Sequence, residues 1–153
     1  MREIFFRAKA INRNPDRKYR TNYKNGDWVY GLISKLYDEE THKRYNFLFA
    51  EMTNESGVSG IDVDYKTIGQ YTGLKDKNGN KVFEGDIVRW KECDHWAPDD
   101  GIVSGYVLYV DGQWLIQRPN IRSYLWWAHS SCEIIGNIYD SELIGGEENA
   151  EVH

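Results

Sequence analysis

The sequence predicts an all-β protein with little helix, built as small β-barrels. Val, Ile, Tyr, Trp and Thr gather in short runs that are separated by turns containing glycine. Asn78-Gly79 and Asp111-Gly112 each stand between apolar runs, which is typical of β-hairpins. No window of 12 residues carries a helical apolar stripe. Many short strands at this spacing favour a barrel or sandwich over a parallel α/β sheet.

The strands follow from apolar runs and alternation, taken in chain order. Gly31 indicates a bulge in the second strand. Asn78-Gly79 suits a type I′ turn. A helical turn is expected at 141–145, and polar loops at 12–24 and 93–100. The expected strands are 4–9, 28–37, 45–51, 61–64, 67–72, 82–83, 86–91, 102–110, 113–118, 124–128 and 133–139.

Two short motifs recur in the same order and suggest an internal repeat. Residues 26–29 read Gly-Asp-Trp-Val and 85–88 read Gly-Asp-Ile-Val, while Ile-Gly pairs follow at 68–69 and 135–136. Glycine before a strand permits a sharp turn, and glycine within one permits close backbone approach. We therefore expect two similar barrel-like halves packed together. The predicted organisation is a domain over 1–146 with halves 1–74 and 75–146, then a disordered acidic tail over 147–153.

Composition narrows the class of protein and its compartment. The chain has 153 residues, of which 41% are hydrophobic and 14% aromatic, too many for a disordered chain. Two cysteines are too few for a secreted disulfide scaffold of this size. No apolar stretch approaches the roughly 20 residues needed to cross a bilayer, and the N-terminal apolar run is too short for a signal peptide. We expect a cytoplasmic protein with no membrane partner.

Charge is distributed unevenly along the chain. Residues 1–24 carry a balance of +6, which leaves −11 for the rest of a chain whose net charge is −5. Tyr19 and Tyr23 lie among the basic residues, and cations with interleaved aromatics suit phosphate contacts and base stacking. A solvated loop, or a contact with the acidic part of a neighbouring subunit, would explain the same pattern. The candidate nucleic-acid-binding residues are Arg13, Arg17, Lys18, Arg20 and Lys24.

Two Cys and two His have a spacing that would permit a tetrahedral zinc site. Cys93 and His95 form one pair, and His129 and Cys132 form the second. Zinc knuckles usually contain Cys-x₂-Cys, which this chain lacks. We therefore interpret these four as ordinary cysteines and histidines, and expect neither a metal nor a cofactor.

Catalytic machinery is not evident in the sequence. Asp94, Asp99 and Asp100 flank His95, and carboxylates beside a histidine suit general acid–base chemistry. Acidic loops are more often simply solvated. No Gly-x-Ser-x-Gly motif and no phosphate-binding glycine loop is present. We expect no catalytic residues and no enzymatic activity.

The pair Trp126-Trp127 indicates an interaction surface. Neighbouring residues of a strand point to opposite faces, so only one of these indoles would enter the core. The other, with Tyr124 and Trp114, would form an exposed aromatic patch, and such patches mark interfaces. A second layer covering both faces is the alternative. We expect a homo-oligomer.

Four segments resemble a known family, in the family's order. Residues 61–88 read IDVDYKTIGQYTGLKDKNGNKVFEGDIV and resemble the central motif of the YopX family, small proteins carried by phages and prophages. The opening MREIFFRAKA, Gly-Asp-Trp-Val-Tyr-Gly at 26–31, and EIIGNIYDSELI at 133–144 resemble its other motifs. The resemblance implies a β-barrel fold, frequent oligomerisation and no established activity or catalytic residues. It also implies a phage accessory protein in the bacterial host cytosol, whose partner is an unidentified host or phage protein.

Overall fold

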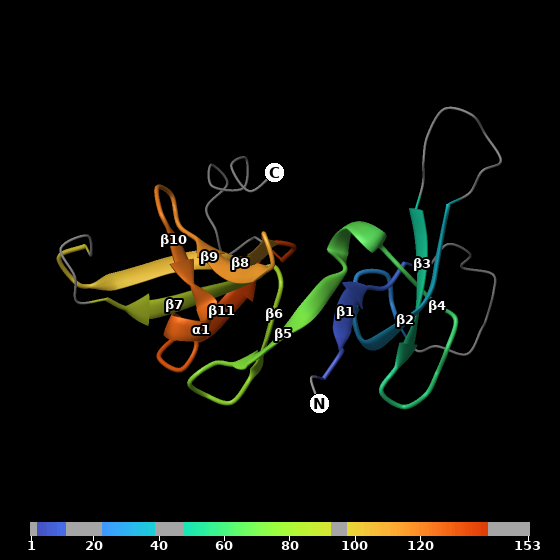
Figure 1. The fold of residues 1–153 in the computed structure, drawn as a ribbon. Helices are drawn as coiled ribbons and strands as arrows, with labels where there is room; N and C mark the ends of the chain where they lie inside the picture. Colours follow the sequence, from blue (N-terminus) through green and yellow to red (C-terminus); the bar gives the residue numbers. More distant parts are fainter. Residues whose placement is uncertain (1–2, 12–22, 39–47, 93–97, 141–153) are drawn as a thin grey trace. The chain divides into compact units, whose positions relative to one another are not determined.

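The computed structural model describes residues 3–11, 23–38, 48–92 and 98–140. The chain divides into two compact units, unit 1 over Met1–Gln70 and unit 2 over Tyr71–His153, whose strands are labelled in Figure 1. Each unit has its own hydrophobic cluster. The predicted helical turn at 141–145 and the acidic tail at 147–153 lie outside the described residues, as does most of the predicted loop over 93–100.

Unit 1 is an antiparallel meander whose last strand returns to the first. Its strand order is β4-β3-β2-β1-β5, and every neighbouring pair is antiparallel. A short 3₁₀ turn, η1, precedes the returning strand β5, which continues beyond Gln70 into unit 2. The elements are β1 (Phe6–Lys9), β2 (Trp28–Asp38), β3 (Leu48–Asn54), β4 (Ile61–Val63), η1 (Tyr65–Thr67) and β5 (Gly69–Lys75).

The sheet of unit 1 curls strongly. The edge strand β4 comes back to the chain that continues β1, where Ala10 forms an isolated bridge with Val63. Backbone bonds flank this bridge, with the Ile11 N–H donating to the Asp62 carbonyl at 2.8 Å. The apolar side chains on the inner face then pack into one cluster, formed by Ala8, Ala10, Val29, Ala50, Met52, Ile61 and Val63.

Gly31 has a different role from the one predicted. The bulge of β2 lies between Ile33 and Lys35, so Gly31 keeps regular pairing with Phe6. A Cβ atom on Gly31 would lie 1.9 Å from the carbonyl oxygen of Thr53. Glycine is therefore required here because the backbones of β2 and β3 approach closely, which is the other role that a glycine within a strand can have.

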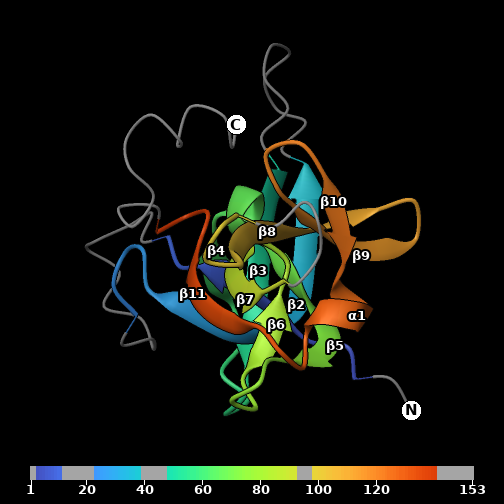
Figure 2. The ribbon, with the colours of Figure 1, turned by 90° about the vertical axis from the view of Figure 1, so that its left-hand side faces the viewer.

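Unit 2 repeats the topology of unit 1. Its main sheet has the order β10-β9-β8-β7-β11, so a four-stranded meander is again followed by a strand that pairs with the first (Figures 1 and 2). A one-turn helix, α1, precedes the returning strand. The elements that follow β5 are β6 (Lys81–Phe83), β7 (Asp86–Lys91), β8 (Ile102–Val110), β9 (Gln113–Gln117), β10 (Arg122–Tyr124), α1 (Leu125–Ala128) and β11 (Glu133–Asn137).

The two predicted hairpins are present, with different turns. Asp111 and Gly112 both have positive φ, 50° and 81°, and join β8 to β9 as a two-residue loop of type I′ character. The loop at Asn78-Gly79 is longer, because Asp76 and Asn80 pair through their backbones at 2.9 Å. Of the two central residues only Gly79 has positive φ, so the expected type I′ turn is replaced by a three-residue loop with a glycine at its end.

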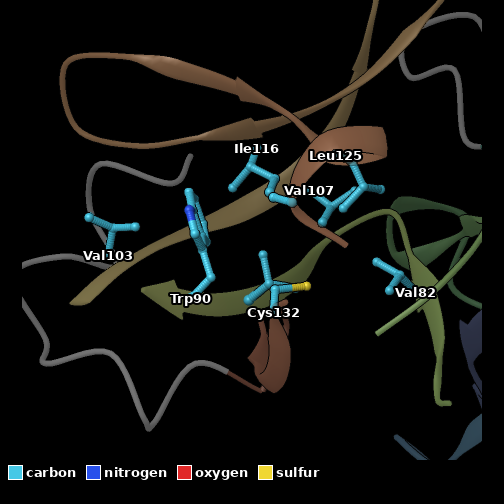
Figure 3. Packing of buried hydrophobic residues seen from close by; sticks show 9 residues of the cluster. Val82, Trp90, Val103, Val107, Ile116, Leu125 and Cys132 are labelled. Atoms are coloured by element: carbon cyan, nitrogen blue, oxygen red, sulfur yellow. The ribbon is translucent and has the colours of Figure 1, made fainter. Parts of the chain in front are cut away.

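The core of unit 2 lies against the inner face of its sheet. Trp90, Val107 and Ile116 come from β7, β8 and β9, and Leu125 of α1 points toward them (Figure 3). Val82 adds a contact from the β5–β6 hairpin. The whole cluster is Val82, Val88, Trp90, Val103, Val107, Ile116, Leu125, Ala128 and Cys132.

The all-β prediction is confirmed, whereas the barrel form is not observed. Within the described ranges, the sheet of unit 2 ends in the edge strands β10 and β11, and that of unit 1 is joined only by the bridge at Ala10, so neither closes as a continuous ladder. Among the repeated motifs, Ile-Gly at 68–69 and 135–136 falls at the returning strand of both units. Gly-Asp at 26–27 precedes the second strand of unit 1, but at 85–86 it leads into the first strand of unit 2.

Candidate interaction surface

The segment between β10 and β11 folds as a helical turn instead of the strand expected over 124–128. The backbone is extended at Tyr124 and then turns, and the His129 N–H donates to the Leu125 carbonyl at 2.8 Å. Residues three apart share one face of a helix, so Leu125 and Ala128 both point into the core and are fully buried. The demand for two inward apolar groups at this spacing selects the helix over the strand.

Both tryptophans of this turn lie on the surface, which corrects the expectation that one of them enters the core. Trp126 is 65% exposed and Trp127 is 58% exposed, since the helix turns both away from Leu125 and Ala128. Tyr124 is 50% exposed, and its ring centroid lies 6.1 Å from that of Trp126. We call these three residues the aromatic surface.

Trp114, which was expected to join this surface, packs elsewhere. It is half-buried against the core of unit 2, and its ring centroid lies 4.9 Å from that of Tyr109. The strand register explains the separation, because Tyr124 pairs with Leu115, and Trp114, the residue before Leu115, points to the opposite face of the sheet. The aromatic surface therefore comes from one short segment, residues 124–127, at the end of β10 and the start of α1.

The aromatic surface stands on a well-ordered base. The Ala128 carbonyl accepts bonds from the N–H groups of Ser131 and Cys132, both at 3.0 Å, and from the Ser131 hydroxyl at 3.0 Å. Leu125, which precedes the two tryptophans, points toward Val107 and Ile116 (Figure 3). Large rings held on a packed base lose little conformational entropy when a partner binds them.

His129 and Cys132, two of the four residues with zinc-compatible spacing, flank the end of the turn. The Nδ1 atom of His129 lies 2.8 Å from the Lys75 carbonyl oxygen, and the Cys132 thiol donates to the His129 carbonyl at 3.4 Å. Burial and the nearby Asp76 carboxylate raise the pKa of the Cys132 thiol to about 11. A thiol with this pKa is protonated at neutral pH and is therefore a poor nucleophile.

The other residues singled out from the sequence are mostly not described. Cys93 and His95 lie outside the described residues, as do Arg13, Arg17, Lys18 and Arg20. Lys24 is exposed, and its backbone N–H donates to the Asp27 carboxylate at 2.8 Å. Within the described ranges no three His, Cys, Asp or Glu side chains gather as a metal site. The predictions about metal and nucleic acid therefore stay predictions.

Asp76 connects this region to the neighbouring loop. Its carboxylate accepts backbone bonds from Asn78 and Asn80, both at 2.9 Å, and from Ile134 of β11 at 3.1 Å. Burial by itself raises the pKa of Asp76, but these backbone donors outweigh it and hold the pKa below its ordinary value. The charged form of Asp76 thus ties the β5–β6 loop to the strand that follows the aromatic surface.

Comparison with known proteins decides the family. The model of the family described as YopX protein matches residues 18–144. The chain belongs to the YopX family. In three dimensions it is similar to the crystal structure of protein EF1440 from Enterococcus faecalis, with 21% identity and a TM-score of 0.49, over 93% of this chain and 98% of the other. No curated protein matches the chain.

Membership of the YopX family assigns no catalytic or binding residues to this chain. The candidate site is therefore defined by the described side chains. Among the described residues there is no helix with the length and apolar character needed to span a bilayer. The described surface offers the aromatic surface at α1, where three exposed aromatic residues lie within four positions of the sequence. The sequence Tyr-Leu-Trp-Trp-Ala at 124–128 predicted an exposed aromatic surface, but the strand on which that prediction was based is a helical turn in the structure.

Proposed function

We propose that this YopX-family protein is a non-enzymatic phage or prophage accessory protein that acts in the bacterial host cytosol as a homo-oligomer. Its further partner would be a host or phage protein. The observation that carries the proposal is the aromatic surface, in which Tyr124, Trp126 and Trp127 are each at least half exposed. Phage origin and the cytosolic compartment rest on the family resemblance.

The chemistry of the aromatic surface suits a protein interface. Trp and Tyr are enriched among the residues that dominate binding energy, whereas Lys, Glu and Asp are depleted there. A second copy of the chain offers the same rings, so a two-fold interface can bury them against one another.

Light scattering of the full chain tests the oligomer. We expect the natural chain at about 20 μM to have a mass above that of a monomer, because a Kd in the micromolar range is within reach of such an interface. The double variant Trp126→Ser/Trp127→Ser removes both indoles and is expected to be monomeric. Tyr109→Ala is the matched control, because Tyr109 is an exposed aromatic residue of β8 that pairs with Trp114 and is not part of the aromatic surface.

Two results would contradict the proposal. A natural chain that is monomeric at this concentration would remove the oligomer. An oligomer whose mass is the same in Trp126→Ser/Trp127→Ser would show that another surface forms the interface.

A further inference from the structure

A second surface lies on unit 1, on the outer face of the β1–β2 ladder. Arg7 pairs with Tyr30 and Lys9 pairs with Trp28, and paired residues of antiparallel strands point to the same face. Ala8 and Val29 occupy the alternate positions and are fully buried in the core of the unit. The two cations and two aromatic rings therefore stand together on the side away from the core.

Cations and rings on this face are in direct contact. The Arg7 guanidinium carbon lies 4.7 Å from the centroid of the Trp28 ring, and the Lys9 Nζ atom lies 5.4 Å from it. These distances are those of cation–π contacts. Arg7 is only 6% exposed. Tyr30 is 36% exposed, and Leu32, the next residue on the same face of β2, is 52% exposed. An accessible ring thus lies beside buried and half-buried positive charge.

The sequence of unit 1 carries less negative charge than that of unit 2, so unit 1 repels an anionic ligand less. Unit 1 contains 12 Lys and Arg against 10 Asp and Glu, a net of +2, whereas unit 2 contains 7 against 14, a net of −7. The site itself is confined to described residues. The Gly26 N–H donates to the Ala10 carbonyl at 2.8 Å, which holds the residues just after β1 beside those just before β2.

We infer that the face formed by Lys9, Trp28 and Tyr30 binds single-stranded nucleic acid, with a base stacked on the Tyr30 ring and a backbone phosphate near Lys9. A sheet face with exposed rings and flanking cations is suited to unstacked bases, since every base has a π face and each phosphate is an anion. A duplex keeps its bases stacked and cannot offer them to a ring on a sheet. This site lies in unit 1 and is independent of the aromatic surface in unit 2.

Fluorescence anisotropy with a labelled 20-residue oligothymidylate tests the inference on the full chain. We expect binding at 50 mM salt that weakens steeply at 200 mM, because phosphate contacts release counterions. Tyr30→Thr keeps a strand-forming residue but removes the ring, and should weaken binding about tenfold. Tyr30→Phe keeps the ring and should bind like the natural chain. Tyr109→Ala, an exposed tyrosine of unit 2, should also leave affinity unchanged.

Lys9→Gln separates charge from stacking. It should reduce the salt slope by about 0.7, the value for one phosphate contact on a single strand. Tyr30→Thr should lower affinity with the slope unchanged. Either variant is used only if its circular dichroism spectrum matches that of the natural chain. Tyr30→Phe complements Tyr30→Thr, because it keeps the aromatic ring and should keep the affinity.

Several results would overturn the inference. Absence of binding at 50 mM salt would do so, as would equal affinity in Tyr30→Thr, or a loss in Tyr30→Phe as large as that in Tyr30→Thr. Equal affinity for a duplex of the same length, or for heparin at equal charge, would reduce the face to a general polyanion contact and would also overturn it.

Discussion

Units 1 and 2 have the same strand topology but differ in the helical turn that precedes the returning strand. In each, four strands form a meander and a fifth returns to the first strand after a short helical turn. In unit 1 that turn is η1, which buries Thr67. The N-cap of η1 is Asp64, whose side chain accepts a hydrogen bond from the Lys66 N–H. In unit 2 it is α1, which buries Leu125 and exposes two indoles. The same connection therefore serves for packing in one unit and for presentation in the other.

The loops of the two units repeat one backbone solution with different side chains. Asn54 accepts from the N–H groups two and four residues later, at Ser56 and Val58. Asp76 does the same with Asn78 and Asn80. Only Asp76 is charged, and only it accepts a further bond from β11. The comparison shows that a side-chain acceptor at the first loop position sets the turn. In Asp76 the second carboxylate oxygen accepts an additional bond from Ile134 of β11.

The largest expected effect tests whether the second strands of the two units are equivalent. A Cβ on Gly31 would lie 1.9 Å from the Thr53 oxygen, and one on Gly105 would lie 2.4 Å from the Gln117 oxygen. Because these are backbone atoms of a paired strand, Gly31→Ala and Gly105→Ala should each lower the free energy of unfolding by about 4 kcal/mol. Urea denaturation followed by circular dichroism measures the loss.

Gly57→Ala is the matched control for these glycines. Gly57 has a φ of 83° with nothing within 4 Å of a Cβ, so only the backbone preference is lost, about 1 kcal/mol. If Gly105→Ala costs no more than Gly57→Ala, the equivalence between the two second strands is wrong.

A somewhat smaller effect tests whether the two cores are separate. Met52 in unit 1 and Leu125 in unit 2 are each fully buried, and truncation to Ala should cost about 3 kcal/mol in either case. Five of the six tryptophans belong to unit 2. The urea midpoint followed by tryptophan fluorescence should therefore fall in Leu125→Ala and stay unchanged in Met52→Ala. An equal shift in both variants would mean that the units unfold as one.

The charged loop should give unit 2 a pH dependence that the neutral loop lacks. The pKa of Asp76 is lowered on folding, so its stabilisation is present above the unfolded pKa of about 3.9 and is lost as pH falls through the folded value. Asp76→Asn removes one acceptor and should cost about 1.5 kcal/mol at pH 7. Thermal unfolding at pH 7 and at pH 3 should show this difference shrinking in acid.

Asn54→Asp is the complementary variant. It keeps the Oδ1 atom that accepts both backbone bonds of the unit 1 loop, replaces the amide that donates to the Tyr23 hydroxyl, and serves as the control for introducing a carboxylate at the matching site. A difference between Asp76→Asn and the natural chain that persists undiminished at pH 3 would show that the carboxylate charge is not what stabilises the loop.

The smallest expected effect is on stability at the aromatic surface. Trp126→Ala and Trp127→Ala should each change the free energy of unfolding by no more than about 0.5 kcal/mol, because both side chains are more than half exposed. Chemical denaturation at low protein concentration, where association is weak, measures this. A loss above 2 kcal/mol in a monomer would place these indoles in the core and remove the interaction surface.

The sequence by itself was sufficient for features that depend on neighbouring residues. The strands at 86–91 and 102–110 have the predicted bounds, because both are runs rich in β-branched and aromatic residues that lie between turn residues. The two-residue loop at Asp111-Gly112 follows from positive φ, which glycine and aspartate adopt at low cost. The all-β class follows from the sum of many such local preferences.

Tertiary structure decided the rest, because it depends on what the chain meets far along the sequence. The segment 124–128 has the composition of a strand, but packing of Leu125 and Ala128 against β8 and β9 selects a helical turn and turns both indoles outward. The cation and ring face of unit 1 arises only when β1 and β2 pair in a register that aligns Lys9 with Trp28. Local preferences determine which strands form, whereas strand register and the demand for buried apolar groups determine which side chains reach the surface together.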